Sequence, residues 1–382
     1  MMKKVAIVGV GLHPFGRFGE KSYQQIGQEA VRMALKDANV TWKDIQVAYL
    51  SSQYLPSTAA SRVLKPLGET GISLVDVEAA CASGGVSVNT AMLAVQAEAC
   101  DLALAVGVEK MPRGFMDPMM NFDKWQVQMG LSTNPSYWAM SARRHMHDYG
   151  TTEMHLAKVA YKNHKNSVDN PASMYRKAFS IEEILASPVV CYPIHLLEIC
   201  APNEGAAAII LCPAEKAHKY TSKPIYIEAC VHVVAKYSSD FRVPIESMSA
   251  KIENPSPVTL ASRKAYEIAG IGPMDMDLIE LQDTDAFCEL QIYENLGLCK
   301  EGESGKLIDD GTTDRNGRIP VNVSGGLISK GEPVGASHLG QIAEIVYHLR
   351  EQAGARQVAG AKIGMAQVLG ARGNCAVTIL KR

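Results

Sequence analysis

The sequence lacks long hydrophobic runs and any strong excess of charge. Its longest apolar runs extend over about eight residues, whereas a membrane-spanning helix needs about 20. The 38 basic and 40 acidic residues give a formal net charge of −2, and the basic residues are scattered along the chain. Scattered and balanced charge argues against a nucleic-acid surface. We therefore expect a protein that acts neither in a membrane nor on nucleic acid.

Paired cysteines are also absent. The chain has nine cysteines, an odd number, with no CxxC pair and no regular spacing. This pattern argues against a disulfide framework and against structural zinc on this chain, and it is typical of reduced thiols in the cytoplasm. The N-terminal segment "MMKKVAIVGVGLHPFG" has two lysines before an apolar run but no small-residue cleavage site. It therefore predicts a buried first strand and not a secretion signal.

Two nucleotide-binding motifs are missing as well. In "GVGLHP", Gly9 and Gly11 fit a dinucleotide fingerprint, but Pro14 stands where the third glycine belongs. No GxxxxGK[ST] segment occurs anywhere in the chain. The glycine-rich segments of this sequence therefore call for another explanation.

Strand and helix patterns alternate along the first 110 residues. Helical patterns at 22–38, 58–67 and 83–98 separate four apolar runs rich in β-branched residues, at 4–10, 45–50, 72–77 and 102–108. This alternation predicts an α/β unit with a largely parallel sheet. A chain of 382 residues has room for two or three such domain-sized units.

One part of this pattern recurs near the C-terminus. The segments "ALKDANVTWKDIQVAYL" from Ala34 and "AYEIAGIGPMDMDLIEL" from Ala265 both contain a helix end, a loop, an aspartate and an apolar strand. A single offset aligns the matching pairs, which are Ala34 with Ala265, Ala38 with Ala269, Val40 with Ile271 and Asp44 with Asp275. We interpret this as an internal duplication that gives two related α/β halves, with chance similarity of two junctions as the alternative.

The region between the halves is rich in Met, Pro, Tyr and His, with helical patterns around 137–170. An insertion of this length in a compact fold is more often a functional lid than a loose loop. The strand "GAAAIILC" at 205–212 then resumes the sheet. We therefore predict four units: a first part of the N-terminal half (1–111), the lid segment (112–203), the return of that half with the crossover (204–255), and a C-terminal half (256–382).

Cys81 lies between an apolar run and a helical pattern, in "VDVEAACASGGVSVNTAMLAV". At a strand-to-helix turn, the positive end of the helix dipole favours a thiolate and lowers a cysteine pKa. The small residues after it leave room for a substrate to approach the sulfur. The alternative is a core cysteine, because free cysteines are among the most buried residues.

Two glycine-dense segments accompany this cysteine. "NVSGGLISKGEPVGASHLGQ" at 322–341 runs into a helical pattern, and "QVLGARGNCAVTIL" at 367–380 enters a final strand. Glycines at this density indicate backbone that passes close to a ligand or adopts positive φ. From these segments we select Gly326, Gly331 and Gly370 as candidate substrate-binding positions.

Together these motifs resemble the thiolase superfamily, and most closely its sterol-carrier-protein and archaeal branch. The resemblance covers nearly the whole chain and is carried, in order, by "KVAIVGVG", "ACASGGVSV", "ARRHMHDYGTT", "NEGAAAIIL", "ASRKAYEIAGI" and "SGGLISKGEPVGAS". It implies a layered α-β-α-β-α fold with an inserted lid and a covalent acyl intermediate on Cys81. It also implies coenzyme A thioesters as substrates, no covalently bound cofactor, and a homodimer.

The sequence departs from that family at its acid–base residues. Gln282 stands in place of the histidine of the first catalytic loop, Glu332 replaces the histidine of the GHP loop, and Gln367 falls where a second cysteine belongs. One interpretation is a rebuilt site, in which a desolvated Glu332 acts as the base and Gln282 donates to an oxyanion. The other is a paralogue that binds or scaffolds without chemistry.

Three further residues belong to the rebuilt-site interpretation. His338 and Cys288 could supply a second proton-transfer group, and Asp283 belongs to the first catalytic loop. Asp283 and Asp285 have a structural alternative as N-caps of the helix that begins with "AFCEL". We expect no metal ligands on this chain.

The resemblance predicts a thiolase that cleaves a 3-ketoacyl-CoA with coenzyme A, or runs the reverse Claisen condensation. The departures resemble thiolase subunits that work with a small zinc-ribbon/OB-fold partner protein, such as those of 2-benzoylsuccinyl-CoA thiolases, which suggests an aromatic acyl group. Two alternatives stay open: a non-catalytic subunit of an acyl-CoA complex, and a thiolase-fold aldolase.

Overall fold

The computed structural model describes residues 3–131, 133–236 and 254–382. Their largest feature is a nine-stranded sheet in the order β3-β2-β4-β7-β1-β8-β11-β10-β9. The strands are β1 (Val5–Gly16), β2 (Val47–Ser51), β3 (Ser73–Val77), β4 (Ala103–Lys110), β7 (Glu204–Pro213), β8 (Ile225–Val233), β9 (Leu278–Glu280), β10 (Ile363–Leu369) and β11 (Cys375–Lys381). The expected strands at 4–10, 45–50, 72–77, 102–108 and 205–212 are all confirmed, although β1 continues six residues beyond its expected end, to Gly16.

The sheet as a whole is mixed, whereas the pairs within the first 110 residues, for which a largely parallel sheet was expected, are parallel. The pairs β2–β3, β2–β4 and β9–β10 are parallel, whereas β1–β7, β1–β8, β4–β7, β8–β11 and β10–β11 are antiparallel. Strands joined by a crossover helix run parallel, but a tight turn such as the one between β10 and β11 reverses the chain. The alternation of strands and helices in the first 110 residues could not reveal these later returns.

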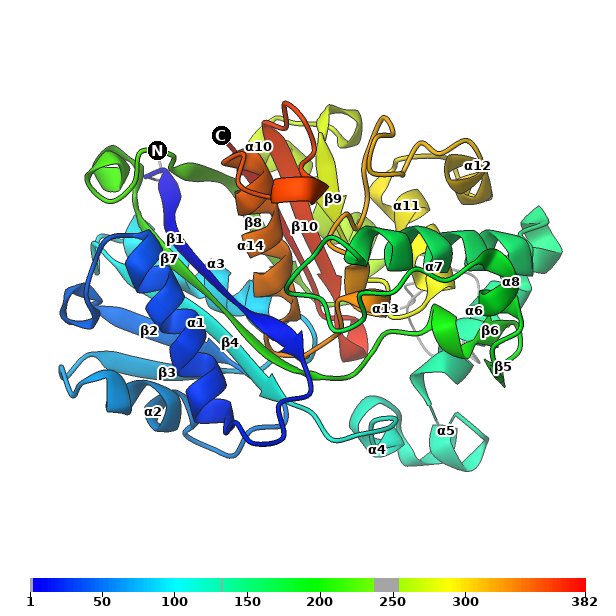
Figure 1. Cartoon of the computed structure of the whole chain (residues 1–382), viewed down its shortest axis with the longest axis horizontal. Coiled ribbons are helices and arrows are strands. Elements are labelled where there is room, and N and C mark those ends of the chain that lie inside the picture. The colour runs from blue at the N-terminus through cyan, green and yellow to red at the C-terminus, as the bar shows by residue number, and fades with distance from the viewer. Residues whose placement is uncertain (1–2, 132, 237–253) are drawn as a thin grey trace.

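The fold has five layers, in which three layers of helices alternate with the two halves of the sheet (Figure 1). The central layer holds α3 (Ser83–Gln96) and α14 (Ser337–Leu349), which pack between the two halves in one buried core. On the outer faces, α1 (Tyr23–Asp37) and α2 (Ala59–Leu64) cover the N-terminal half, while α10 (Pro257–Ala269) and α11 (Ala286–Leu296) cover the C-terminal half. The layered α-β-α-β-α architecture is therefore confirmed.

The predicted internal repeat corresponds to matching structure in both halves. In the first half, α1 is followed by the 3-10 turn η1 (Trp42–Asp44) and β2; in the second, α10 is followed by η5 (Pro273–Asp275) and β9. The turns and the strands begin at the same offset of 231, as 273 − 42 and 278 − 47 show. In both turns the aspartate accepts a backbone N–H three residues earlier, Asp44 from Thr41 and Asp275 from Gly272.

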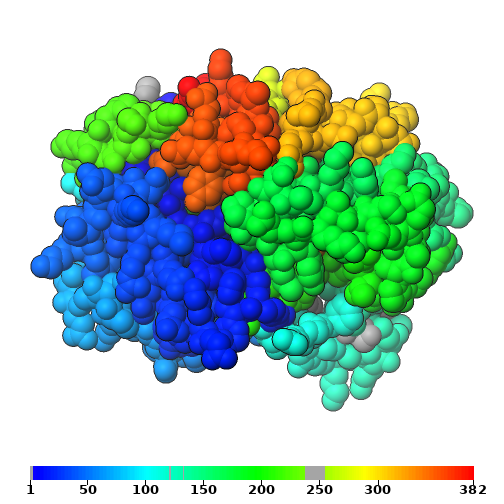
Figure 2. All heavy atoms as spheres, viewed as in Figure 1, coloured from blue at the N-terminus to red at the C-terminus, as the bar shows by residue number. Residues whose placement is uncertain are grey.

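The predicted lid segment carries most of the remaining helices. It contains α4 (Pro118–Asn121), α5 (Lys124–Gln128), α6 (Asn134–Tyr149), α7 (Glu153–Ser167) and α8 (Ile181–Leu185), with the short strands β5 (Val189–Cys191) and β6 (Ile194–His195). In Figure 2 this teal-to-green segment lies beside the N-terminal half and against the C-terminal half. It packs there on α11, α12 (Ser304–Asp309) and α13 (Gly326–Ser329).

The domain boundaries themselves stay predictions. The unit predicted at 204–255 includes residues 237–253, which lie outside the described residues. Among the helices of the described residues, none combines the length and the apolar character that a membrane span requires.

Candidate active site

Cys81 lies in a tight turn between β3 and α3, as the sequence predicted. Ala80 adopts a positive φ of 50°, an uncommon conformation for a residue with a side chain. The Ser83 hydroxyl holds this turn, because it donates to the Ala80 carbonyl at 2.6 Å and accepts the Ala79 N–H at 2.7 Å. The turn therefore fixes the position of the Cys81 sulfur relative to the start of α3.

The electrostatic environment of Cys81 is the reverse of the expected one. Burial, followed by the negative charge of Glu332, raises the pKa of the Cys81 thiol well above its ordinary value. The expectation of a thiol pKa lowered by the helix N-terminus was wrong, because desolvation and a neighbouring carboxylate outweigh the helix dipole. Cys81 is therefore held as a thiol that needs a base.

Glu332 is held beside Cys81 because its backbone pairs with the backbone at residues 201–202. Its N–H donates to the Ala201 carbonyl at 2.9 Å, and Pro202 pairs with it as an isolated bridge. Gly331 precedes it with φ +110°, and a Cβ at Gly331 would lie 1.7 Å from Asn203 Nδ2. The glycine at position 331 therefore permits close packing of the protein against itself, and this packing fixes the position of Glu332.

The Glu332 carboxylate accepts hydrogen bonds from two side chains and lies close to the Cys81 thiol. Cys200 Sγ donates to Oε2 at 3.0 Å, and Gln282 Nε2 donates to Oε1 at 2.7 Å. The Cys81 thiol lies close enough for the negative charge of Glu332 to raise the pKa of the thiol. Burial raises the pKa of Glu332 above the ordinary glutamate value, although these donors oppose that rise. A carboxylate with a raised pKa and two neighbouring thiols is suited to proton transfer.

Gln282 has a different position from the one expected of an oxyanion donor. Both amide hydrogens are used inside the protein, one on Glu332 and one on Thr284 Oγ1 at 3.0 Å. Its backbone N–H donates to Gln367, the residue that occupies the place of the family's second cysteine. In this arrangement Gln282 orients the Glu332 carboxylate, and only its buried Oε1 lacks a partner among the described residues.

Asp283 and Asp285 hold the ends of helices. The Asp283 carboxylate accepts the backbone N–H groups of Leu327 and Ile328 in α13, and a Cβ at Gly326 would lie 2.1 Å from it. Asp285 is the N-cap of α11, which confirms the structural role that the sequence left open for this residue. Gly326 therefore makes room for a buried carboxylate of the protein itself.

Among the described residues, His338 and Cys288 make their hydrogen bonds to groups other than the Glu332 carboxylate. The two ring nitrogens of His338 contact Gln341 and Thr378, and burial lowers its pKa to about 4. Cys288 donates to the Gln282 carbonyl at 3.4 Å. Gly370 packs on the nucleophile turn instead, because a Cβ there would lie 3.0 Å from the backbone nitrogen of Cys81.

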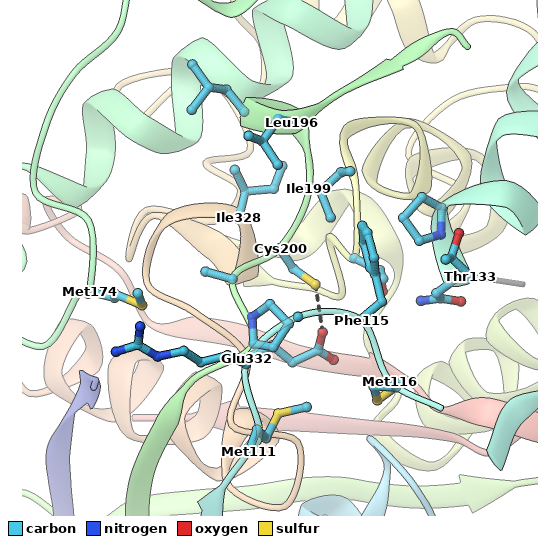
Figure 3. Close-up of a pocket in the computed structure, with 18 of the residues that line it drawn as sticks. Met111, Phe115, Met116, Thr133, Met174, Leu196, Ile199, Cys200, Ile328 and Glu332 are labelled. Carbon is cyan, nitrogen blue, oxygen red and sulfur yellow. Dashed lines mark hydrogen bonds between the residues drawn. The ribbon is translucent and has the colours of Figure 1, made fainter. Parts of the chain in front are cut away.

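A cavity of about 710 Å³ reaches this cluster from the lid segment. Glu332 and Cys200 line it, whereas Cys81, which is half-buried, is not among its lining residues. Most of the wall is apolar, and Figure 3 shows Phe115 and Met116 across from Ile199 and Ile328. The cavity is large enough for an organic acyl group next to the two polar residues.

Sequence reasoning missed Cys200. Its N–H donates to the Thr284 carbonyl at 2.9 Å, and its sulfur points to Glu332 (Figure 3). The only local signal was its place in "EICAPNEGAAA", directly before a motif that carries the family resemblance. Among the described residues, no group of three or more His, Cys, Asp or Glu side chains could hold a metal ion.

Two family comparisons cover both halves of the chain. Residues 5–185 match the family described as "Thiolase, N-terminal domain", and residues 245–382 match "Thiolase C-terminal domain-like". The chain therefore belongs to the thiolase family, as the sequence motifs indicated.

Individual relatives sharpen this assignment. The chain is 36% identical to the acetyl-CoA acetyltransferase of Methanothermobacter thermautotrophicus, over 98% of both chains. It is 36% identical to human sterol carrier protein 2, over 100% of this chain and 72% of that one. It is 32% identical to the benzoylsuccinyl-CoA thiolase subunit BbsB of Thauera aromatica, over 98% of this chain and 96% of the relative. The protein is an acyltransferase of thiolase type.

Solved structures agree on the fold. The Ltp2-ChsH2(DUF35) aldolase superposes with a TM-score of 0.85 at 24% identity, covering 99% of this chain and 98% of that one. Human mitochondrial 3-ketoacyl-CoA thiolase in complex with CoA superposes with a TM-score of 0.74 at 16% identity, covering 99% and 98%.

Proposed function

We propose that this thiolase cleaves a 3-ketoacyl-CoA with coenzyme A, or runs the reverse condensation, through an acyl group on Cys81. The observation that carries the proposal is the Glu332 carboxylate, held by Cys200 and Gln282 and close enough to the Cys81 thiol, at a strand-to-helix turn, for its charge to raise the pKa of that thiol. A thiol whose pKa is raised needs a base at the moment of attack, and the Glu332 carboxylate is the neighbouring charge that acts most strongly on it.

The reaction follows the usual logic of covalent catalysis. The Cys81 sulfur attacks the 3-keto carbon while Glu332 takes its proton, and the bond between the keto carbon and the α-carbon breaks. Coenzyme A then takes the acyl group from the sulfur. Gln282 keeps the base in place by its hydrogen bond to Oε1 at 2.7 Å.

We propose an apolar acyl group as the substrate, with aromatic 3-oxoacyl-CoA thioesters such as 2-benzoylsuccinyl-CoA as candidates. The apolar lining of the cavity supports this, as do its volume of about 710 Å³ and the similarity to BbsB. Phe115, Met116 and Phe122 of the lid segment supply much of that lining.

We also propose a homodimer and, as a further requirement, a small zinc-ribbon/OB-fold partner protein. Two similar proteins support the partner: BbsB is named as a thiolase subunit, and the solved Ltp2-ChsH2(DUF35) aldolase is named together with a DUF35 protein. All nine cysteines are free thiols, which supports a reducing compartment such as the cytoplasm.

Mass spectrometry of the Cys81 peptide tests this function. The protein is incubated with acetoacetyl-CoA and with phenyl-substituted 3-oxoacyl-CoA thioesters, with and without a candidate partner. We expect an acyl adduct on Cys81, and we expect Cys81→Ala to lose both the adduct and thiolysis. A Cys81→Ala variant that cleaves as fast as the parent would exclude the acyl-cysteine route, and cleavage without any adduct would support an aldolase.

A further inference from the structure

The proposed reaction needs proton transfer at two different atoms. One proton leaves the Cys81 sulfur, and one must reach the α-carbon of the departing acyl-CoA when the carbon–carbon bond breaks. The family resemblance implies histidines and a second cysteine as acid–base residues, but Gln282, Glu332 and Gln367 occupy those positions here. The second proton donor must therefore come from elsewhere in the site.

Most polar groups near Glu332 are already engaged. His338 binds Gln341 and Thr378, and Asp283 accepts backbone N–H groups of α13 and Asn163 Nδ2. Cys288 donates to the Gln282 carbonyl, and Cys375 accepts from Gln367 at 3.8 Å. None of these four side chains lines the cavity.

Cys200 differs from them in two respects. It lines the cavity, so a substrate can reach its sulfur, and that sulfur donates to Glu332 Oε2 at 3.0 Å. Its backbone is fixed on both sides, by the bond from Cys200 N–H to Thr284 and the bond from Ala201 N–H to Leu327. The thiol is therefore held between the base and the space for the substrate.

We propose that Cys200 is the second proton-transfer residue of this site, and that Glu332 carries protons between it and Cys81. The proposal rests on the function proposed above. It assigns a catalytic role to a cysteine that comes from the end of the lid segment instead of the C-terminal glycine turn.

In the first half-reaction, every proton that leaves one group of the site is taken up by another or by the leaving acyl-CoA. Glu332 takes the proton of Cys81 as the sulfur forms its bond to the keto carbon. The bond to the α-carbon breaks, and the resulting carbanion of the leaving acyl-CoA takes the proton of Cys200. Glu332 returns its proton to the Cys200 thiolate, so the first half-reaction ends with acyl-Cys81, a Cys200 thiol and free carboxylate. Burial and the Glu332 charge raise the pKa of Cys200 well above its ordinary value, which keeps it protonated beforehand.

Two partial reactions separate this role from that of Cys81. Exchange of the methyl hydrogens of acetyl-CoA with D₂O requires proton transfer at the α-carbon, whereas exchange of labelled coenzyme A into acetyl-CoA requires only acyl transfer through Cys81. We expect Cys200→Ala to slow hydrogen exchange and thiolysis about 100-fold or more, as for loss of a general acid, while coenzyme A exchange stays close to the parent rate. The matched control is Cys191→Ala, a half-buried cysteine of β5 in the same lid segment, which should leave both rates unchanged.

Cys200→Ser is the conservative variant. A serine hydroxyl can keep the hydrogen bond to Glu332 and hold the loop, but it is a much weaker acid than a thiol. We therefore expect hydrogen exchange to fall at least about tenfold in this variant too. Parental hydrogen exchange in either variant would overturn the proposal, and so would an equal loss of both exchange reactions, which is the result of a structural role.

The outcomes also distinguish this proposal from the proposed function. If the parent shows no acyl adduct and no coenzyme A exchange, the acyl-Cys81 mechanism fails. In that case, a loss of hydrogen exchange in Cys200→Ala that the control Cys191→Ala does not share would still identify Cys200 as the residue that moves the α-proton.

Discussion

At the scale of single residues, the Glu332 carboxylate controls the protonation of two thiols, those of Cys81 and Cys200. It raises the pKa of Cys81 and of Cys200 by its charge, and burial raises its own pKa. These shifts have a common cause, because a buried site penalises every additional negative charge. A proton can therefore move among the three groups, while the site as a whole resists a second negative charge.

The variant Glu332→Gln separates two effects of the negative charge of Glu332, which are its action as a base and the rise that it causes in the Cys81 pKa. We expect thiolysis to fall about 100-fold or more, because the base is lost. We also expect the Cys81 pKa to fall, because the amide carries no negative charge, so iodoacetamide should alkylate Cys81 faster at about pH 8, near the ordinary thiol pKa. The measurements are the thiolysis rate and the pH dependence of Cys81 alkylation, with exposed Glu20→Gln as the control. Slower alkylation in Glu332→Gln would contradict the arrangement described here.

The same carboxylate sets the acid side of the parent pH profile. Glu332 acts as a base only when deprotonated, and its pKa lies above the 4.5 of an ordinary glutamate. The thiolysis rate should therefore decline as pH falls through a midpoint above 4.5, and this decline should be absent from the residual activity of Glu332→Gln. The groups that face the carboxylate are Cys81, Cys200 and Gln282, of which the two thiols titrate only at alkaline pH.

Motif order was enough to predict that Cys81, Gln282 and Glu332 belong to one site. Cys200 could not be found in the same way, because it lies outside the motifs that carry the resemblance, and its hydrogen bond to Glu332 is formed only in the folded chain. The direction of the Cys81 pKa was also beyond the sequence. A helix start is visible as a local pattern, but the burial of a neighbouring carboxylate is a property of the tertiary packing.

At the scale of elements, the glycines of the segment 322–341 serve the packing of the protein against itself. Gly326 admits the Asp283 carboxylate to the start of α13, and Gly331 admits Asn203 beside the backbone that carries Glu332. Both glycines have positive φ, at 61° and 110°. The sequence predicted close approach here correctly, but the closest neighbours among the described residues are side chains of the protein.

Gly331→Ala tests this explanation. The added Cβ would lie 1.7 Å from Asn203 Nδ2 in a conformation that disfavours side chains, so we expect a loss of at least about 2 kcal/mol in the free energy of unfolding. Glu332 should shift with its backbone, which should also reduce kcat. Urea denaturation and thiolysis assays measure the two effects.

Gly360→Ala is the matched control for that variant. Gly360 also has a positive φ, of 71°, but a Cβ there would meet nothing within 4 Å. Its cost should be limited to the backbone conformation, about 1 kcal/mol, with kcat unchanged. Equal losses of stability in the two variants would show that the contact with Asn203 has no effect of its own.

At the scale of the whole molecule, the two ends of the nine-stranded sheet differ. The strand β9 at one end has three residues, all buried, and Ile279 also pairs with Val321. The strand β3 at the other end is largely exposed, and β2 is its only partner among the described strands. An exposed sheet edge is a template for pairing with another chain. This edge is therefore our candidate interface for the proposed homodimer.

The alternation of strands and helices predicted the strands at this edge, since β2, β3 and β4 are linked by crossover helices and run parallel. It could not predict that the two halves meet in one sheet, because that junction is the antiparallel pairing of β1 with β8, more than 200 positions apart. Only the pairing of distant strands decides which edges are left open.

Val75→Lys tests the interface at β3. Val75 is 38% exposed and lies in the middle of the strand. In a two-fold symmetric pairing of β3 with its copy, the same positions approach each other, so two introduced lysines would repel and lose apolar contact. We expect light scattering after size-exclusion chromatography to show a dimer for the parent and a monomer for the variant. Val189→Lys, at a 54% exposed valine of β5, should remain dimeric. Because β3 leads directly into the turn that holds Cys81, the monomeric variant should also lose thiolysis. A dimeric Val75→Lys protein would place the interface elsewhere. A monomeric parent would refute the homodimer.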